Sequence, residues 1–448
     1  MSDLTKQPAD EETAAAEEAA ADTPQPAADA TQPAADATQP AAVDPRLLVR
    51  EQGFAGYLND FKRRVRGGEL GSLPVVIGLI VIAVVFQLKN SSFLSADSLA
   101  NIGVYTSGLG IMAVGIVFVL LLGEIDLSVG SVAGVGAAVW AVLSVTHGVN
   151  DWLAVLIAVV AGVAIGALHG FFFAKIGVPA FVVTLAGFLG WSGLQIWMMG
   201  QEGSINTPSG SVVENLTGYY FEDKAAAYGL ALVAVLAYAA SQLLDSKRRK
   251  TAALPSRPMS EILLRTGVVA VLSFAVAYVL NEPEGARGLP LALVLFLAVL
   301  VIADFVVRRT SYGRQIFAVG GNAEAARRAG INVNKIRISV FAISGMLAAF
   351  GGLFIASLSG GATKNLGSGN TLMNVIAAAV IGGTSLFGGR GKIWSALLGM
   401  LVIQSIQQGL NLLGMASEIQ YMITGAVLLA AVVIDSVSRR TQKTAGRT

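Results

Sequence analysis

The stretch LANIGVYTSGLGIMAVGIVFVLLL, residues 99–122, contains no charged side chain and decides the class of fold. A helix of this length, at about 1.5 Å per residue, crosses roughly 30 Å of hydrocarbon. A buried helix of a soluble protein can imitate one such stretch. Eleven further apolar segments lie before and after it, however, so a bundle of membrane-spanning helices is expected.

The composition of the whole chain agrees with this fold class. Hydrophobic residues make up 54% of the 448 residues and charged residues 13%, whereas soluble proteins carry about 25% charged residues. The 51 glycines suit helices that approach each other closely in lipid. Because the chain has no cysteine and two histidines, we predict no disulfide, no thiol nucleophile and no metal site.

We predict an all-α, polytopic transmembrane bundle with about 12 membrane segments. The fourth segment contains Gly162-x-x-x-Gly166-x-x-x-Gly170, a spacing that predicts close packing against another helix. The predicted segments are 73–89, 99–122, 129–146, 151–173, 180–200, 225–244, 260–280, 289–307, 336–357, 371–389, 393–413 and 418–435.

The basic residues predict the orientation of the bundle. One set of alternating loops, together with both ends of the chain, holds 23 lysines and arginines. The opposite set holds four, namely Lys89, Lys224, Arg287 and Lys364. Loops rich in lysine and arginine stay in the cytoplasm, so both termini are expected to be cytoplasmic.

The ends of the chain differ in composition from the segments between them. Residues 1–45 are Ala/Pro-rich and hold ten acidic residues and one lysine, which predicts a disordered cytoplasmic tail. Residues 46–72 form a basic juxtamembrane segment. The membrane-spanning domain is expected over 73–435, and a basic cytoplasmic tail over 436–448.

Two of the predicted segments carry helix-breaking residues. Gly177-Val178-Pro179 opens the fifth segment, and Gly382-Gly383 interrupts the tenth. Interrupted helices at membrane depth are tolerated where they line a cavity or are covered by protein. We therefore expect both segments to be broken.

The loop after the second segment reads Gly123-Glu-Ile-Asp-Leu-Ser-Val-Gly-Ser131 and holds two carboxylates without a lysine or arginine. An acid at membrane depth costs about 2.5–3.5 kcal/mol, so it seldom lies there without a role. Asp126 or Ser128 is expected to cap the helix that follows. With no nucleophile or metal ligand nearby, catalysis is discounted. The structural motif comprises Glu124, Asp126, Ser128, Ser131 and Pro179.

A short helix is predicted over 323–329 in the longest basic loop, 308–335. Asn322 is a suitable N-cap, Arg327 lies in the last turn, and Gly330 suits the stop after the helix. Its alanines form a small face that could seat in a partner protein. The residues proposed for this contact are Gly320, Gly321, Asn322, Glu324, Ala326, Arg327 and Gly330.

Neutral polar residues in the last segments are candidates for a substrate pathway. Amides and hydroxyls can bind sugar hydroxyls, although they can equally join helix to helix. The candidates are Asn370, Thr371, Asn374, Gln404, Gln408 and Asn411. The glycine-rich stretch 382–393 lacks the spacing of a phosphate-binding loop, so no ATPase site is expected in this chain.

Four motifs resemble the ribose, galactose and xylose permeases of bacterial ABC importers. They are 124–131, 177–185, 312–331 and 381–389, and the resemblance covers about 73–435. It implies a multi-pass protein of the bacterial cytoplasmic membrane without an enzymatic activity of its own. It also implies that the loop around 322–331 engages a partner ATPase.

The resemblance further implies a set of partners. These are an ABC ATPase that binds ATP and Mg²⁺, an extracytoplasmic sugar-binding protein and a second permease copy, with the chain itself holding no cofactor and contacting no nucleic acid. The sixth and seventh segments look like an insertion in the ten-segment plan. This longer plan is most similar to the xylose branch, which favours a pentose.

Three alternatives remain open at the level of sequence. A secondary transporter of the major facilitator type also has twelve helices, but it usually carries a basic signature where this chain has Glu124-Ile-Asp126. An integral membrane enzyme would be expected to cluster acids or histidines. A related permease for a nucleoside or another small polar solute fits the same motifs.

Overall fold

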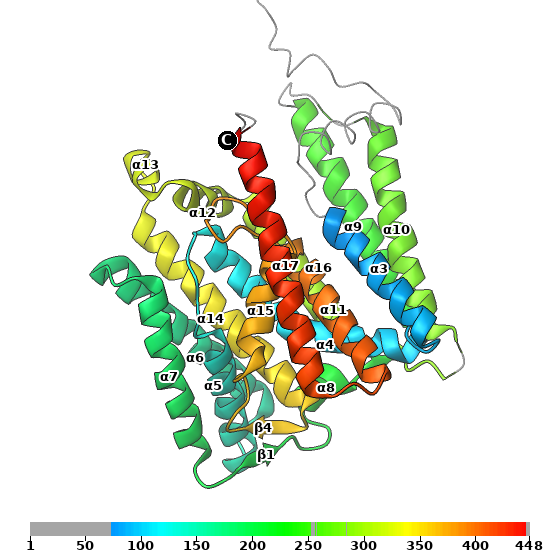
Figure 1. The fold of residues 1–448 in the computed structure, drawn as a ribbon, viewed down its shortest axis with the longest axis horizontal. Helices are drawn as coiled ribbons and strands as arrows, with labels where there is room; N and C mark the ends of the chain where they lie inside the picture. Colours follow the sequence, from blue (N-terminus) through cyan, green and yellow to red (C-terminus); the bar gives the residue numbers. More distant parts are fainter. Residues whose placement is uncertain (1–72, 252–255, 257, 284, 445–448) are drawn as a thin grey trace, which may run out of the picture. The chain divides into compact units, whose positions relative to one another are not determined.

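The computed structural model describes residues 73–251, 256, 258–283 and 285–444, so the predicted acidic tail and juxtamembrane segment lie outside the described residues. The described chain is mostly helical (Figure 1). The helices are α3 (Leu73–Lys89), α4 (Ala96–Leu121), α5 (Val129–Ala141), α6 (Asp151–Phe171), α7 (Ala180–Met199), α8 (Val212–Gly218), α9 (Lys224–Thr251), α10 (Met259–Asn281), α11 (Leu291–Arg309), α12 (Ser311–Gly321), α13 (Ala323–Arg328), α14 (Val333–Leu358), α15 (Asn370–Ile381), α16 (Trp394–Leu412) and α17 (Ser417–Thr444).

Short π-helical turns and strands complete the described elements. The turns η1 (Val142–Thr146) and η2 (Phe172–Ile176) end α5 and α6. β1 (Ser204–Asn206) pairs antiparallel with β4 (Gly361–Thr363), and β2 (Tyr220–Phe221) pairs with β3 (Leu289–Pro290). The β1–β4 pair and α13 lie at opposite ends of the bundle (Figure 1).

Each of the twelve predicted segments coincides with a described helix, but their number as membrane spans is not confirmed. Among the described residues, eight helices are long and apolar enough to cross a membrane, counting η1 and η2 with the helices that they end. They are α4, α5, α6, α7, α9, α10, α11 and α14. α3 and α15 are shorter apolar helices.

The glycine spacing in α6 packs against α14, as predicted. A Cβ at Gly166 would collide with the carbonyl oxygen of Phe341, and one at Gly162 would collide with that of Gly345. A Cβ at Gly170 would lie 2.6 Å from Cα of Ile338. Only glycine permits this approach, which brings the backbones of the two helices into contact.

Helix α4 is the most deeply covered of the candidate spans, with 89% of its apolar window buried. It contacts the helices α11, α14, α15 and α16. Gly108 faces Phe354 of α14, and the ring of Phe296 of α11 fills the space beside Gly110. The stretch that decides the fold class therefore also forms the centre of the core.

Helices α9 and α10, which hold the sixth and seventh predicted segments, pack mainly on each other. Ala227 of α9 and Ala277 of α10 belong to a small apolar cluster that also contains Ala100 of α4. The pair is tied to α11 by an ion pair between Asp245 and Arg309, 2.7 Å apart. Most of its large apolar side chains are exposed.

Neither predicted break lies within a described helix. In the tenth segment α15 ends at Ile381 and the next helix, α16, begins at Trp394, so Gly382 and Gly383 follow the helix and the segment was predicted too long. The prediction for the fifth segment was wrong as well. Helix α7 is continuous, Pro179 precedes its first residue, and Gly177 takes a φ of +87° between η2 and α7. The glycine and proline separate two helices and do not break one.

Two elements extend beyond the sequence prediction. Helix α12 was not predicted, because its residues were assigned to the basic loop 308–335. Its buried residues Gly313, Ile316 and Val319 recur every three positions and form one apolar face. Helix α17 continues to Thr444, past the predicted boundary at 435.

Candidate functional site

The loop between α4 and α5 contains a buried carboxylate that joins several helices. Asp126 is 2% exposed, and its Oδ1 accepts hydrogen bonds from N and Oγ of Ser128, at 2.9 and 2.6 Å. Its Oδ2 accepts a hydrogen bond from Oγ of Ser344 in α14, at 2.9 Å. Both carboxylate oxygens are therefore satisfied, which is what a buried acid requires.

This hydrogen-bond network continues into α6 and α7. Oγ of Ser128 lies 3.2 Å from Nδ1 of His169, and Nε2 of His169 accepts a hydrogen bond from Nε1 of Trp191, at 2.8 Å. We refer to Asp126, Ser128, His169, Trp191 and Ser344 as the Asp126 network. Sequence reasoning missed Trp191 and Ser344, because no local pattern links residues so far apart along the chain.

The prediction that Asp126 or Ser128 caps helix α5 was wrong. Ser128 occupies the N-cap position of α5, but its side chain makes no capping hydrogen bond, because it is committed to Asp126 and His169. Asp126 accepts the N–H of Ser128 and reaches no N–H within the helix. Oγ of Ser131 donates to the carbonyl oxygen of Ser128, at 2.8 Å. The loop is thus held by tertiary contacts.

Glu124 has a different environment from Asp126. It is half-buried, and burial raises the pKa of its carboxyl, while the positive charge of Arg337 lowers it and offsets part of that shift. The guanidinium of Arg337 in turn stacks over the ring of Phe173, with CZ 4.3 Å from the ring centroid. Glu124 and Arg337 therefore form a half-buried charged pair of residues at the end of the bundle that bears α13.

The end of α12 and two loops that are distant in sequence meet at the end of α4. A Cβ at Gly320 would collide with the carbonyl oxygen of Leu121, and one at Gly388 would lie 2.6 Å from that of Gly320. The N–H of Gly389 donates to the same oxygen of Leu121, at 3.0 Å. A Cβ at Gly123 would lie 3.3 Å from the carbonyl oxygen of Phe387. The predicted motifs 123–131, 312–331 and 381–389 therefore form one contact region.

Helix α13 is confirmed at residues 323–328, one residue shorter than predicted. Oδ1 of Asn322 accepts the N–H of Ala325 at 2.9 Å, and Gly330 takes a φ of +82° after the helix. The prediction that Ala326 belongs to a small face available to a partner was wrong, because Ala326 is 4% exposed and packs inward. Ala325 and Ala329 are exposed, as are Gly321, Asn322, Glu324 and Arg327.

The candidate pathway residues do not form one site. Gln408 of α16 donates to Oγ of Ser98 in α4, at 3.2 Å, and Asn411 accepts from Gln420 of α17, at 2.7 Å. These two side chains join helices, as the alternative interpretation stated. Asn374 and Gln404 are buried, with side chains that are 8% and 5% exposed. Asn370 is exposed and Thr371 is half-buried.

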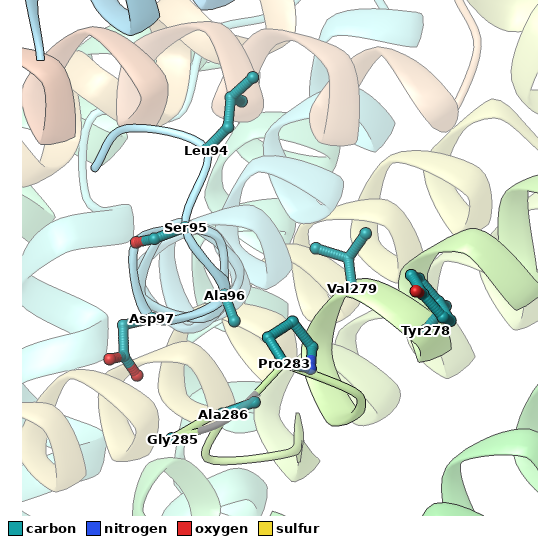
Figure 2. A pocket seen from close by; sticks show the side chains of 9 residues that line it. All are labelled: Leu94, Ser95, Ala96, Asp97, Tyr278, Val279, Pro283, Gly285 and Ala286. Atoms are coloured by element: carbon teal, nitrogen blue, oxygen red, sulfur yellow. The ribbon is translucent and has the colours of Figure 1, made fainter. Parts of the chain in front are cut away.

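A cavity of about 430 Å³ lies away from these residues, between the start of α4 and the end of α10 (Figure 2). Side chains from Leu94 to Asp97 form one wall, and Tyr278, Val279 and the loop around Pro283 form the other. Asp97 there pairs with Arg287, at 3.0 Å. The cavity contains none of the candidate pathway residues.

Comparison with known proteins gives the family. Residues 98–432 match the model described as "Branched-chain amino acid transport system / permease component". The chain belongs to this family. As a member of this permease family with eight apolar helices among its described residues, it is a multi-pass protein of the bacterial cytoplasmic membrane.

Similar proteins include permeases of Escherichia coli and Haemophilus influenzae. The xylose transport system permease protein XylH of Escherichia coli (strain K12) is 34% identical over 368 residues, which cover 82% of this chain and 92% of the relative. The XylH of Haemophilus influenzae is 32% identical, over 82% of this chain and 98% of the relative. The ribose import permease protein RbsC of the same organism is 32% identical, over 80% and 91%. No solved structure matches the chain.

Proposed function

We propose that this chain is the membrane-spanning subunit of an ATP-driven importer for a monosaccharide, with a pentose such as xylose as the favoured substrate. The observation that carries this proposal is the similarity to xylose permeases along almost their whole length. A ribose permease matches as well, so the choice among sugars rests on the larger similarity to the xylose proteins. A nucleoside or another small polar solute is the alternative substrate.

Both termini and the α13 end of the bundle are proposed to be cytoplasmic. The 23-to-4 distribution of lysine and arginine between the two sets of loops supports this orientation. Arg327 and Arg328 of α13 and the basic residues at the end of α9 belong to the richer set. In this orientation the β1–β4 pair faces the outside, where a sugar-binding protein would deliver substrate.

The partner ATPase is proposed to dock on α13 and to supply the ATP and Mg²⁺ site that this chain is expected to lack. A six-residue helix is marginal alone, and α13 is held by Ala326 packed against the protein. Its exposed face, with Ala325 and Ala329, is available to a partner. Gly320 in α12 lies against the backbone of Leu121 at the end of α4. A displacement of α13 would therefore be transmitted through α12 to the central helix α4.

The translocation pathway is proposed to involve Asn374 and Gln404. Both are buried on helices α15 and α16, which pack on α4, and neither makes a strong hydrogen bond to another described helix. Gln408 and Asn411 are better explained as contacts between helices. A second copy of the chain is proposed to complete the pathway, as in a permease homodimer.

Substrate competition tests the proposed substrate class. Cells that carry the permease with its own ATPase and binding protein are expected to take up labelled xylose. Excess unlabelled xylose should suppress this uptake more strongly than ribose or a nucleoside. Uptake that a nucleoside suppresses and xylose does not would replace the pentose by the alternative solute.

A further inference from the structure

Helix α7 is attached to the rest of the protein along a narrow strip. Of its 20 residues, the buried ones are Ala180, Thr184, Gln195 and Met199. Its outer face exposes large apolar side chains such as Leu189 and Trp197, at 67% and 77%. Because few residues of α7 are buried against the bundle, its position depends on the specific contacts of the inner strip.

The inner strip makes polar contacts with both ends of the bundle. Thr184 approaches the carbonyl oxygen of Ile125 in the 123–131 loop, at 3.4 Å. Nε2 of Gln195 donates to the carbonyl oxygens of Thr363 and Leu366, at 2.8 and 3.2 Å, next to β4. Trp191, between them, contacts His169. A displacement of α7 would therefore break contacts at both ends of the bundle.

Glycines with left-handed backbone bound this helix. Gly177 has a φ of +87° and Gly200 a φ of +56°. No atom lies within 4 Å of a Cβ built at either residue, so packing does not restrict them. Such residues can change their backbone angles at little cost, and they are suited to act as hinges at the two ends of α7.

The donors and acceptors of the Asp126 network fix the direction of every hydrogen bond in it. The indole Nε1 of Trp191 can only donate, so Nε2 of His169 accepts and its ring proton lies on Nδ1. Nδ1–H then donates to Oγ of Ser128, whose own proton goes to Asp126. Trp191 thus selects the tautomer of His169 that supports the loop.

Close approach of α7 to this histidine depends on one glycine. A Cβ at Gly187 would collide with Nε2 of His169. Residue 187 faces the same ring nitrogen that Trp191 binds, so a side chain at this position would push α7 away without removing any hydrogen-bonding group.

We propose that Trp191 and His169 are positioning residues that fix the 123–131 loop, and that α7 is a hinged helix whose departure from the bundle releases this loop. In the attached state Trp191 sets the His169 tautomer, and the loop is held through Ser128 and Asp126. When α7 swings out at Gly177 and Gly200, His169 loses its selected tautomer and the loop is freed. The inference concerns the permease chain itself and does not require the proposed substrate.

Single introduced cysteines test the proposal, because the natural chain has none. Thr184→Cys reports on α7, and Ser131→Cys, in the first turn of α5 where the 123–131 motif ends, reports on the release of the loop, since both positions are buried. The rate of reaction with N-ethylmaleimide is measured on full-length purified protein. Trp191→Phe removes one hydrogen bond, which should speed labelling of both cysteines about fivefold. Gly187→Ala should have the same effect.

The matched control is Trp197→Phe, an exposed tryptophan on the same helix, which should leave both labelling rates unchanged. If Trp191 only packs α7 in place, Trp191→Phe will speed labelling at position 184 and leave position 131 unchanged. That outcome, or unchanged rates at both positions, overturns the proposal. Faster labelling at both positions with Trp191→Phe and Gly187→Ala, but not with Trp197→Phe, supports it.

Discussion

Oγ of Ser344 donates a 2.9 Å hydrogen bond to Oδ2 of Asp126, and 218 positions of sequence separate the two residues. The bond connects the 123–131 loop to α14, which also packs against α6 and α4. Because the carboxylate is buried and fully satisfied, it stabilises the meeting point of these helices only as long as each partner is present.

Asp126→Ala should destabilise the protein by about 2–3 kcal/mol, since the N–H of Ser128 and the hydroxyls of Ser128 and Ser344 lose their acceptor. Asp126→Asn should cost less, because its amide oxygen can still accept from Ser128 and its NH₂ can donate to Ser344. Thermal unfolding of the purified protein measures both. Equal losses for the two variants would show that the negative charge itself is needed.

Gly166→Ala should destabilise by about 1–3 kcal/mol, because the added Cβ would collide with the carbonyl oxygen of Phe341 and force α6 away from α14. Gly190→Ala is the matched control. Nothing lies within 4 Å of a Cβ at Gly190 in α7, so this change should be neutral or stabilising. A control as destabilised as Gly166→Ala would contradict the packing described here.

Glu124→Gln should be at least as stable as the natural protein at pH 7. Burial raises the pKa of Glu124, so the folded state binds its proton more tightly than the unfolded state. Its contribution therefore favours folding below the ordinary pKa of about 4.3 and is lost as the pH rises through the folded pKa. The advantage of Glu124→Gln should shrink as the pH falls toward this range.

Glu282→Gln is the control for this pH series, because the pKa of Glu282 is lowered whereas that of Glu124 is raised. A hydrogen bond from Lys224 lowers the pKa of Glu282, so its contribution is present above its ordinary pKa and is lost as the pH falls through the folded pKa. This variant should not exceed natural stability at pH 7. A clear loss of stability for Glu124→Gln at pH 7 would contradict the account of its burial.

Ala329→Trp and Ala326→Trp should have different effects in α13. Ala329 is exposed, so its replacement should leave the amount of folded permease unchanged and reduce co-purification of the ATPase severalfold. Ala326 is buried, and the bulky residue should lower the amount of folded permease instead. Natural ATPase recovery with Ala329→Trp would indicate that the exposed face of α13 is not the docking site.

The sequence predicted the helices better than their contacts. Apolar runs placed all twelve predicted segments on described helices, and Asn322 and Gly330 placed the ends of α13, because these signals are local. Helix α12 was missed because its residues were assigned to the basic loop 308–335. Gly313 and Gly320 permit close approach to the backbones of Val307 and Leu121, which only the folded chain brings near.

In the candidate site, too, local features were predicted and contacts between distant residues were not. Asp126 was singled out as an acid between apolar runs, but its role as a cap was wrong, since its partners come from distant helices. Ala326 was assigned to the outer face of α13, whereas packing onto the bundle turns it inward. Which side of a short helix meets the protein cannot be decided from its composition alone.

The source of energy for transport distinguishes an ATP-driven importer from a secondary transporter. The permease is reconstituted into liposomes together with the ATPase that co-purifies with it, and labelled xylose uptake is measured in the presence of its binding protein. Uptake is expected to require ATP hydrolysis and to persist when a protonophore removes the proton gradient. Uptake by the permease alone, driven by a proton gradient and indifferent to ATP, would contradict the account and favour a secondary transporter.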